Sequence, residues 1–301
     1  MERKVVLVTG SGSGIGRAIV ESLALAGHIV YASMRDIAGR NKARREEFAH
    51  FSQEKRVDLR VIELDVLSEI SCKAAVDQIL FEEGRLDVAV NNAGMLMIGM
   101  GEAFSPSQLL QIFDTNVVSW LRVNRAVLPV MRRQGRGLLV YTGSTTAKLI
   151  EPFMTPYVAS KAAGEALAEA MSFEVTSFGV ETVIVVPGAF TTGTEHFADA
   201  RGPETIAVQT QYGDLPNTVF GLGDKLDAID AANGGSGGVQ AVGNAVRDVL
   251  ALPHGERPSR VFVDFQEKGA DEMHALTQAK QEAFFTKLGI DRLMSIPKDK
   301  R

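Results

Sequence analysis

The chain has 301 residues, 45% of them hydrophobic and 23% charged, a composition typical of one large α/β domain or two small ones. Its net charge of −5 comes from 32 basic and 37 acidic side chains that are interspersed, so no basic stripe is offered to nucleic acid. The single cysteine, Cys72, excludes an internal disulfide and a multi-thiolate metal site, and we expect no metal. No apolar stretch is long enough for a signal peptide or a membrane span, which favours a cytoplasmic protein.

The first predicted strand is the short apolar run 5–8, which has the composition of a strand buried on both faces. A glycine-rich turn follows it and leads into a segment with helical periodicity. Such a unit binds phosphate, because glycine lets the backbone approach the ligand and the helix N-terminus supplies N–H groups with partial positive charge. A tight connection without a ligand is the simpler alternative. The residues predicted to contact a pyrophosphate are Gly10, Ser11, Ser13, Gly14, Ile15 and Gly16.

The end of the second predicted strand, 28–33, bears on which dinucleotide is bound. Folds that prefer NAD usually place an acid here to accept hydrogen bonds from the ribose hydroxyls, but this chain has Met34 followed by Arg35. A guanidinium can hold a 2′-phosphate that a carboxylate would repel, so the sequence favours NADP(H) over NAD(H). Two alternatives stay open. Asp36 could neutralise Arg35, or the two residues could simply cap the next helix.

Tyr157 and Lys161 are four residues apart in a predicted helix that begins at Pro156, so their side chains share one helix face. A free phenol has a pKa of about 10, and a neighbouring ammonium group lowers it toward the range useful for acid-base catalysis. Ser144 ends a predicted strand, 138–141, and its hydroxyl could hold the oxygen on which Tyr157 acts. Taken alone, this spacing is more often a solvated lysine beside a half-buried tyrosine, so its meaning depends on the surrounding motifs.

Five motifs in this order resemble those of the classical short-chain dehydrogenase/reductase (SDR) family. The glycine turn has the spacing T-G-x-x-x-G-x-G, residues 91–94 read N-N-A-G, and a P-G-x-x-x-T pattern begins at Pro187. The serine and the Y-x-x-x-K pair complete the set. The resemblance covers residues 4–192 well and the remainder loosely. It implies a single doubly wound Rossmann-type α/β domain with a parallel sheet, which agrees with the alternation of predicted strands and helices, and a homodimer or homotetramer.

The resemblance also implies a reaction, the transfer of hydride between a nicotinamide and a carbonyl or secondary alcohol of a small molecule. Ser144 would bind the oxygen and Tyr157 would be the general acid or base. Lys161 would lower the pKa of Tyr157 and hold the nicotinamide ribose, while Asn116 would order a water linked to Lys161. On its own, a mid-helix asparagine more often bonds its own backbone. The further cofactor contacts expected are Asp65 at the adenine, and Val66, Asn92, Ala93, Gly94, Pro187, Gly188, Phe190 and Thr192.

Apolar residues near these motifs favour an apolar ketone or alcohol as the substrate. The predicted pocket walls are Met95, Leu96, Met97, Leu149, Ile150, Phe153, Met154 and Phe190, of which half could be ordinary core. Three alternatives remain: an NAD(H)-dependent alcohol dehydrogenase, a binding protein that senses NADP(H) without catalysis, and a lyase or epimerase. The glycine spacing disfavours the last of these. Among the histidines, only His196 is expected within reach of the substrate.

The sequence pattern changes after Thr192. Residues 193–238 look irregular and are predicted to be a substrate-lid insertion, with Gly234–Gly238 as a hinge or a plain flexible connection. A helix at 239–252 and a strand at 260–265 would complete the sheet. Residues 266–301 are predicted to be a helical extension whose apolar side carries Phe284, Phe285 and Leu288, and the charged segment 41–55 a solvated helix face. We expect residues 1–301 to form one domain.

Overall fold

A computed structural model describes residues 2–219, 221–234 and 238–297, so residues 235–237 of the predicted hinge lie outside the described residues. Its centre is a parallel sheet of seven strands in the order β3-β2-β1-β4-β5-β6-β7. This confirms the predicted single α/β domain with a doubly wound sheet. The strands are β1 (Val5–Val8), β2 (Ile29–Met34), β3 (Leu59–Glu63), β4 (Val88–Asn91), β5 (Gly137–Thr142), β6 (Val180–Pro187) and β7 (Arg260–Val263).

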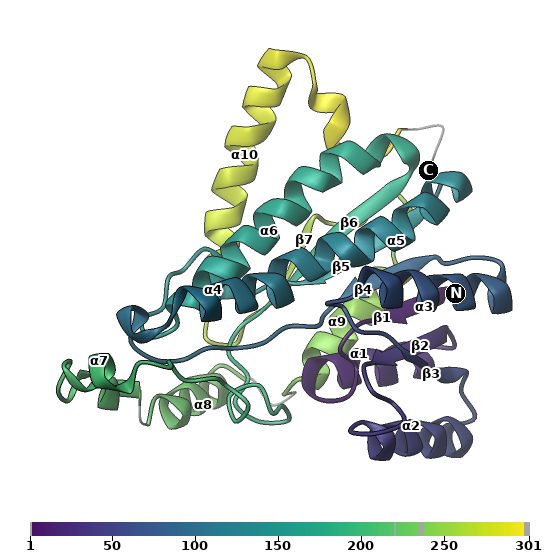
Figure 1. Ribbon diagram of the computed structural model, residues 1–301. Coiled ribbons are helices and arrows are strands. Elements are labelled where there is room, and N and C mark those ends of the chain that lie inside the picture. The colour runs from purple at the N-terminus through teal and green to yellow at the C-terminus, as the bar shows by residue number, and fades with distance from the viewer. Residues whose placement is uncertain (1, 220, 235–237, 298–301) are drawn as a thin grey trace.

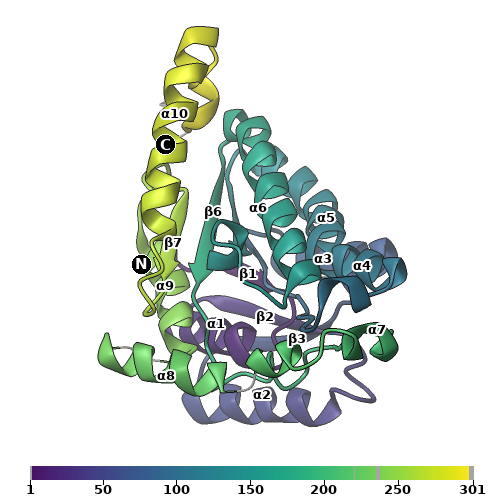
Figure 2. The ribbon, with the colours of Figure 1, turned by 90° about the vertical axis from the view of Figure 1, so that its left-hand side faces the viewer.

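The central strands are apolar throughout because both faces of the sheet are covered. In β1 all four side chains are buried, and its residues alternate between two cores. Val5 and Leu7 belong to the core under α3 (Glu69–Glu83), α5 (Ser119–Gln134) and α6 (Thr155–Val175). Val6 and Val8 belong to the core under α1 (Gly14–Leu25), α2 (Lys42–Lys55) and α9 (Gln240–Ala251). Figure 2 shows these two helical layers on opposite sides of the strands.

The order of the strands reverses at β1, which pairs with β2 on one side and with β4 on the other. Leu7 is opposite Tyr31 of β2 and opposite Ala89 of β4, so the three strands are in register at the middle of the sheet. In open parallel sheets a ligand crevice forms at this reversal, outside the carboxyl ends of the strands. The turns that follow β1 and β4 are therefore the first place to look for a binding site.

The helix that carries Asn116 begins at Pro106 and is interrupted. It begins as α4 (Pro106–Phe113), passes through a π-helical turn at Asp114–Val118, and continues as α5. Ser105 and Gln108 close its start with a reciprocal capping box. A π turn inserts an extra residue into a helix and is found frequently at functional sites. Asn116 lies within this turn.

The segment 193–238 is not irregular, which corrects the prediction. It contains α7 (Ile206–Thr210), a 3-10 turn (Leu215–Val219) and α8 (Leu222–Ala232). Neither α7 nor α8 has a buried residue, so the apolar periodicity that reveals a docked helix is weak here. Figure 1 shows α7 and α8 together at one end of the molecule.

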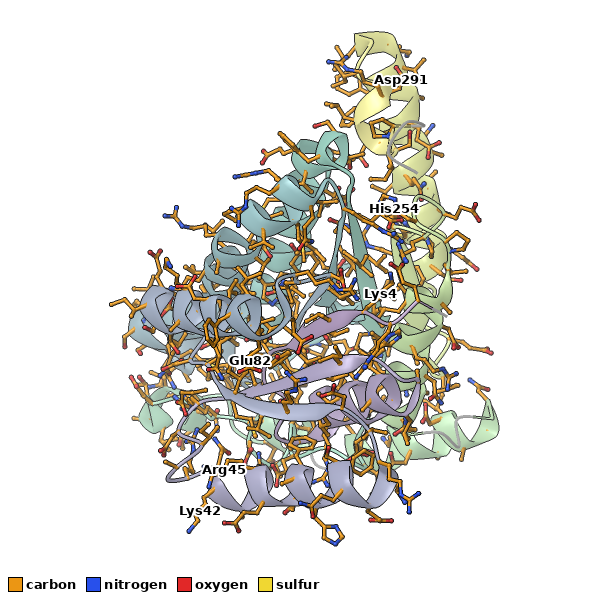
Figure 3. All side chains as sticks on the ribbon, turned by 90° about the vertical axis from the view of Figure 1, so that its right-hand side faces the viewer. Lys4, Lys42, Arg45, Glu82, His254 and Asp291 are labelled. Atoms are coloured by element: carbon orange, nitrogen blue, oxygen red, sulfur yellow. The ribbon has the colours of Figure 1, made fainter. Side chains whose placement is uncertain are left out.

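The predicted C-terminal helix is present as α10 (Ala270–Leu288), which rises away from α7 and α8 (Figure 1). Asp291, just beyond α10, and Lys42 on α2 lie at opposite extremes of the molecule (Figure 3). Phe285 packs against Phe173 of α6 with ring centroids 5.1 Å apart, whereas Phe284 and Leu288 are exposed. The expected apolar side is thus only partly docked. No helix in the described part of the chain is both long and apolar enough to cross a membrane.

Candidate active site

The carboxyl ends of the central strands open into a cavity of about 780 Å³. Most of the residues predicted for a cofactor or substrate line it. The lining members are Gly10, Ser13, Gly14, Ile15, Gly16, Arg35, Asp65, Val66, Asn92, Ala93, Gly94, Met95, Leu96, Ser144, Met154, Tyr157, Lys161, Pro187, Gly188 and Phe190. Motifs that are far apart in the sequence therefore line the same cavity.

The glycine turn and the N-N-A-G run form the floor of the cavity together. The Thr9 hydroxyl accepts hydrogen bonds from the backbone N–H groups of Asn92 and Ala93, at 3.0 and 3.1 Å. A Cβ on Gly10, whose φ is +62°, would lie 2.7 Å from the Cα of Ala93, and one on Gly16 would lie 2.3 Å from the carbonyl oxygen of Gly10. Only glycine fits at either position, because the two turns are in backbone contact.

Ser11 does not reach the cavity, contrary to the prediction. It is fully buried, and its hydroxyl donates to the carbonyl oxygen of Ser33 at 3.0 Å. Gly12, the next residue, lines the cavity instead. The turn directs Ser11 between β1 and β2, where its hydroxyl has a backbone partner.

The end of β2 is basic. Arg35 lines the cavity, and so do Arg40 and Arg44, although the segment from residue 41 was predicted to be only a solvated helix face. The Asp36 carboxylate accepts from the N–H groups of Gly39 and Arg40, at 3.1 and 2.8 Å, so it is directed to its own turn. Its φ of +52° belongs to that tight turn. Of the three arginines, Arg44 pairs with Glu195.

Ser144, Tyr157 and Lys161 meet at one side of the cavity. Pro156 lies in the first turn of α6, a position that suits its fixed φ, and places Tyr157 beside the end of β5. The Lys161 ammonium donates to the carbonyl oxygen of Thr142 at 2.8 Å and lies 5.7 Å from the centroid of the Tyr157 ring. The Ser144 hydroxyl accepts from the Thr146 hydroxyl at 2.9 Å. All three side chains are buried.

Burial dominates the acid-base properties of this group. It raises the pKa of Tyr157 to about 12, although a hydrogen bond with Ser144 acts in the opposite direction. Burial also lowers the pKa of Lys161 to about 8. The sequence predicted that Lys161 lowers the pKa of Tyr157. In the structure burial is the largest cause, Glu151 and Glu165 raise the pKa further, and Lys161 does not contribute, so the phenol is protonated at neutral pH.

Asn116 is buried behind the cavity wall and does not line it. Its amide oxygen accepts from the N–H of Met95 at 2.8 Å, and its amide nitrogen donates to the Met95 carbonyl at 2.9 Å and to the Ser160 hydroxyl at 3.0 Å. The π turn therefore presents an amide that ties the strand-end segment carrying Met95 to helix α6.

Comparison with known proteins agrees with this geometry. The family model for short chain dehydrogenase matches residues 4–201. The chain belongs to the short-chain dehydrogenase family. It is 33% identical to the 3-ketodihydrosphingosine reductase of Bacteroides thetaiotaomicron over 71% of this chain and 73% of that protein. It is 36% identical to human 17-beta-hydroxysteroid dehydrogenase type 1 over 62% of this chain, but the match spans only 57% of the human protein.

Solved structures of the family share the whole fold. A short-chain dehydrogenase from Streptomyces avermitilis superposes with a TM-score of 0.73 at 27% identity, covering 96% of this chain and 97% of that one. An alcohol dehydrogenase from Thermococcus sibiricus, complexed with 5-hydroxy-NADP, gives a TM-score of 0.66 at 25% identity, covering 87% and 96%. The match to the family model ends at residue 201, whereas the Streptomyces avermitilis structure covers most of the segments after it.

The structure does not bring every predicted residue to the cavity. Thr192 of the P-G-x-x-x-T pattern is exposed and outside the lining, whereas Thr194 lies beside Gly14. Leu149 and Phe153 are also outside the lining, and Phe153 occupies a turn with φ +64°. The other non-lining members of the predicted pocket are Met97, which is fully buried, and Ile150, which is exposed.

The far side of the cavity is more polar than the sequence predicted. Its charged and amide side chains are Gln111, Glu151, Glu195, Asp199, Arg201 and Lys268. Lys268 pairs with Glu151 at 2.7 Å and lies 3.3 Å from the Thr145 hydroxyl. His196 also lines the cavity, with its ring edge toward Tyr157 at a centroid distance of 5.8 Å. Burial and the charge of Lys161 lower its pKa to about 4, so its imidazole is neutral.

Proposed function

We propose that this short-chain dehydrogenase reduces the carbonyl group of a small lipophilic molecule, with NADPH as the hydride donor and Tyr157 as the proton donor. The observation that carries the proposal is the convergence of Ser144, Tyr157 and Lys161 on the cavity whose floor is the glycine turn. Hydride transfer coupled to proton transfer needs a proton donor beside the bound dinucleotide. The hydroxyl of Ser144, the phenol of Tyr157 and the ammonium group of Lys161 meet that need next to the glycine turn.

The cavity fits a nicotinamide dinucleotide. Bare backbone at Gly10 and Gly16 and the N-terminus of α1 form a cradle for the pyrophosphate, and a side chain at either glycine would meet backbone atoms. The segment at Pro187 and Gly188 and the side chain of Lys161 would hold the nicotinamide and its ribose. When bound, the nicotinamide supplies or accepts the hydride. The protein's residues orient the substrate and move the proton.

The proton step follows from the acid-base state of the site. Ser144 would hold the substrate oxygen, and Tyr157 would donate its phenolic proton to that oxygen as negative charge develops. Because its pKa is raised to about 12, the phenol is present in the donating form throughout the neutral range. This state favours reduction over oxidation at neutral pH, since oxidation begins with removal of that proton. Lys161, with a pKa of about 8, would return a proton to the phenolate.

The preference for NADP(H) is supported by the basic end of β2. Arg35, Arg40 and Arg44 line that part of the cavity. Arg44 pairs with Glu195, whereas the carboxylate of Asp36 is hydrogen-bonded within its own turn. A 2′-phosphate would be held by charge-assisted hydrogen bonds at this end. The Thermococcus sibiricus relative was solved with an NADP derivative.

The substrate class is inferred from the wall and the relatives. Met95, Leu96, Met154 and Phe190 supply an apolar surface, while Glu151 and Lys268 supply a polar end. The names of two relatives refer to a ketosphingoid and to hydroxysteroids. We therefore propose a ketone with an apolar body and one polar end, covered by segment 193–238 as a lid. The predicted homo-oligomer would use the exposed Leu109, Leu110 and Leu121 of α4 and α5.

The test is to measure initial rates with NADPH and NADH on steroid, long-chain and polyol ketones. We expect turnover with the lipophilic ketones and a preference for NADPH. Arg35→Ala should raise the KM for NADPH by about 10- to 100-fold, the loss of one charge-assisted bond, and leave the KM for NADH unchanged. Arg45→Ala is the matched control, because Arg45 lies on the same helix as Arg44 but does not line the cavity. Cofactor binding without turnover of any ketone or alcohol would contradict the proposal.

A further inference from the structure

A buried carboxylate lies under the loop that carries Ser144. Glu165 is on α6, one turn beyond Lys161, and is 2% exposed. Its Oε1 accepts a hydrogen bond from the backbone N–H of Ser144 at 3.1 Å. The loop passes so close that a Cβ on Gly143 would lie 2.4 Å from this oxygen. Glu165 therefore contacts the backbone at the strand end that holds the substrate-binding hydroxyl.

The other oxygen of Glu165 is paired with Arg260, the first residue of β7. Nη2 of Arg260 lies 3.3 Å from Glu165 and 2.9 Å from Glu169, and the arginine side chain is buried. Nη1 lies 3.0 Å from Nδ1 of His274 on α10. A chain of contacts thus runs from the C-terminal helix through the last strand to the active-site serine.

This arrangement is poorly explained by stability alone. A buried ion pair contributes little net stability, because the loss of hydration offsets the attraction between the charges. The Nε of Arg260 is, in addition, buried without a hydrogen-bond partner among the described residues. Arg260 nevertheless holds Glu165 in place. Among the described residues, Glu165 is the carboxylate that both contacts the Ser144 loop and shifts the pKa values of Tyr157 and Lys161.

We propose that Glu165, held by Arg260, is a positioning residue that fixes the backbone of Ser144 and sets the charge around Tyr157 and Lys161. This inference rests on the proposed reductase function and deepens it. Arg260 and His274 lie beyond residue 201, where the match to the family model ends, so the device draws on the part of the chain outside that match.

The charges that face the two titrating groups fix the direction of the effect. Glu165 raises the pKa of Lys161, and Glu165 together with Glu151 raises the pKa of Tyr157. His196, on the opposite side, is neutral because its pKa is lowered to about 4. Removal of the Glu165 charge therefore lowers the pKa of both Tyr157 and Lys161. In ketone reduction, activity is lost when Tyr157 loses its proton, so the alkaline limb of the rate profile moves to lower pH.

The experiment is the pH profile of ketone reduction by Glu165→Gln, with Glu169→Gln as the matched control. Glu169 pairs with the same guanidinium but does not contact the Ser144 loop. We expect Glu165→Gln to lower kcat by about 10- to 100-fold through misplacement of Ser144, because the amide can accept from the Ser144 N–H only by pointing its NH2 group at the Arg260 guanidinium. Its alkaline limb should move down by roughly half to one pH unit. The KM for the cofactor should stay within about twofold, and Glu169→Gln should keep the wild-type limb.

A second variant separates the loss of the Glu165 contact from a general loss of folding. Glu165→Gln/Arg260→Gln removes both buried charges, so neither is left unpaired in the core, and the same shift of the limb is expected. If the wild type turns over ketones and both Glu165 variants keep its kcat and its limb, the positioning role is wrong while the reductase function stands. If both lose kcat equally at every pH, Glu165 is only structural. A wild type inactive on every ketone would overturn the reductase function itself.

Discussion

The cavity has two walls that are held in different ways. The strand-end wall, made of the turns after β1, β4, β5 and β6, is fixed by backbone hydrogen bonds such as the one from the N–H of Thr9 to the carbonyl oxygen of Val90, at 3.0 Å. The far wall, made of residues 194–201 and Lys268, is held by two side-chain ion pairs, Arg44 with Glu195 and Lys268 with Glu151. Its backbone is hydrogen-bonded to the strand-end wall at one end, where Arg201 pairs with Leu96 and Ile98. Buried backbone contacts hold one geometry, whereas partly exposed ion pairs contribute about 0–1 kcal/mol and exchange readily with solvent. We therefore expect the chemistry on the strand-end wall and the substrate selectivity on the far wall.

The largest difference between the walls should appear when the proton donor is removed. Tyr157→Phe should lower kcat by about 10²–10⁴-fold, the range of general acid-base catalysis, with cofactor affinity retained. His196→Phe, which keeps a ring beside Tyr157 from the far wall, should lower kcat by less than about tenfold. Single-turnover rates with NADPH would measure both. Near-normal turnover by Tyr157→Phe would show that the far wall, and not Tyr157, supplies the proton.

The buried lysine of the strand-end wall should reduce stability at neutral pH. Because the pKa of Lys161 is about 8 in the folded protein and its ordinary value is 10.5, the unfolded chain binds more protons between these limits. Stability should therefore rise with pH from about 8 to 10.5. Lys161→Met should be more stable than the wild type below pH 8, by up to about 3 kcal/mol, and the gain should vanish as the pH approaches 10.5. Urea denaturation across this range measures it.

Lys268→Met is the control on the far wall for that experiment. Lys268 is paired with Glu151 at the cavity surface, so its loss should give no pH-dependent gain in stability. If both lysine variants showed the same pH dependence, burial of Lys161 would not be its cause.

Glycine substitutions should separate the tightly packed floor of the strand-end wall from α8, which does not line the cavity. Gly16→Ala would place a Cβ 2.3 Å from the carbonyl oxygen of Gly10, and we expect a loss of about 1–3 kcal/mol in the free energy of unfolding. Gly223→Ala, in α8, meets no atom within 4 Å and should stabilise the protein by about 0.4–1 kcal/mol. Equilibrium unfolding in urea with unchanged slopes would measure both. Equal effects at the two sites would contradict the rigid floor.

The smallest effect should come from the ion pair that joins the walls. Arg44 on α2 meets Glu195, and each side chain is at least a third exposed. Glu195→Gln should change stability by less than about 1 kcal/mol, and salt should reduce even that difference. Thermal unfolding at two ionic strengths would measure it. A larger effect that salt does not weaken would indicate that the far wall is as rigid as the strand-end wall.

The strand-end wall was largely predictable because its residues follow local patterns. Ser144 was predicted at the end of a strand, and Tyr157 and Lys161 were predicted one turn apart on a helix. The structure brings all three to one cavity. The parallel sheet likewise followed from short apolar runs. Ser11 was misplaced because spacing alone does not say which residue of a turn faces inward. The π turn at Asn116 was not predicted, because such a turn leaves no signature in apolar periodicity.

The far wall could not be predicted in the same way. Thr194, and not Thr192, lies beside Gly14 because of how segment 193–238 docks, and Lys268 reaches Thr145 across 123 residues of chain. Arg44 sits in a charged run that reads equally well as a solvated helix. These positions depend on contacts between distant segments, for which a single sequence gives no periodic signal.

The bonds between Thr9 and the N-N-A-G run join residues 83 and 84 positions apart in sequence. The loop between these residues must close before the site exists. Folding should therefore yield a floor that can bind a nucleotide only after about the first third of the chain has folded. During synthesis, a nascent chain that has not yet emerged beyond β4 would have its glycine turn and still be unable to capture a dinucleotide.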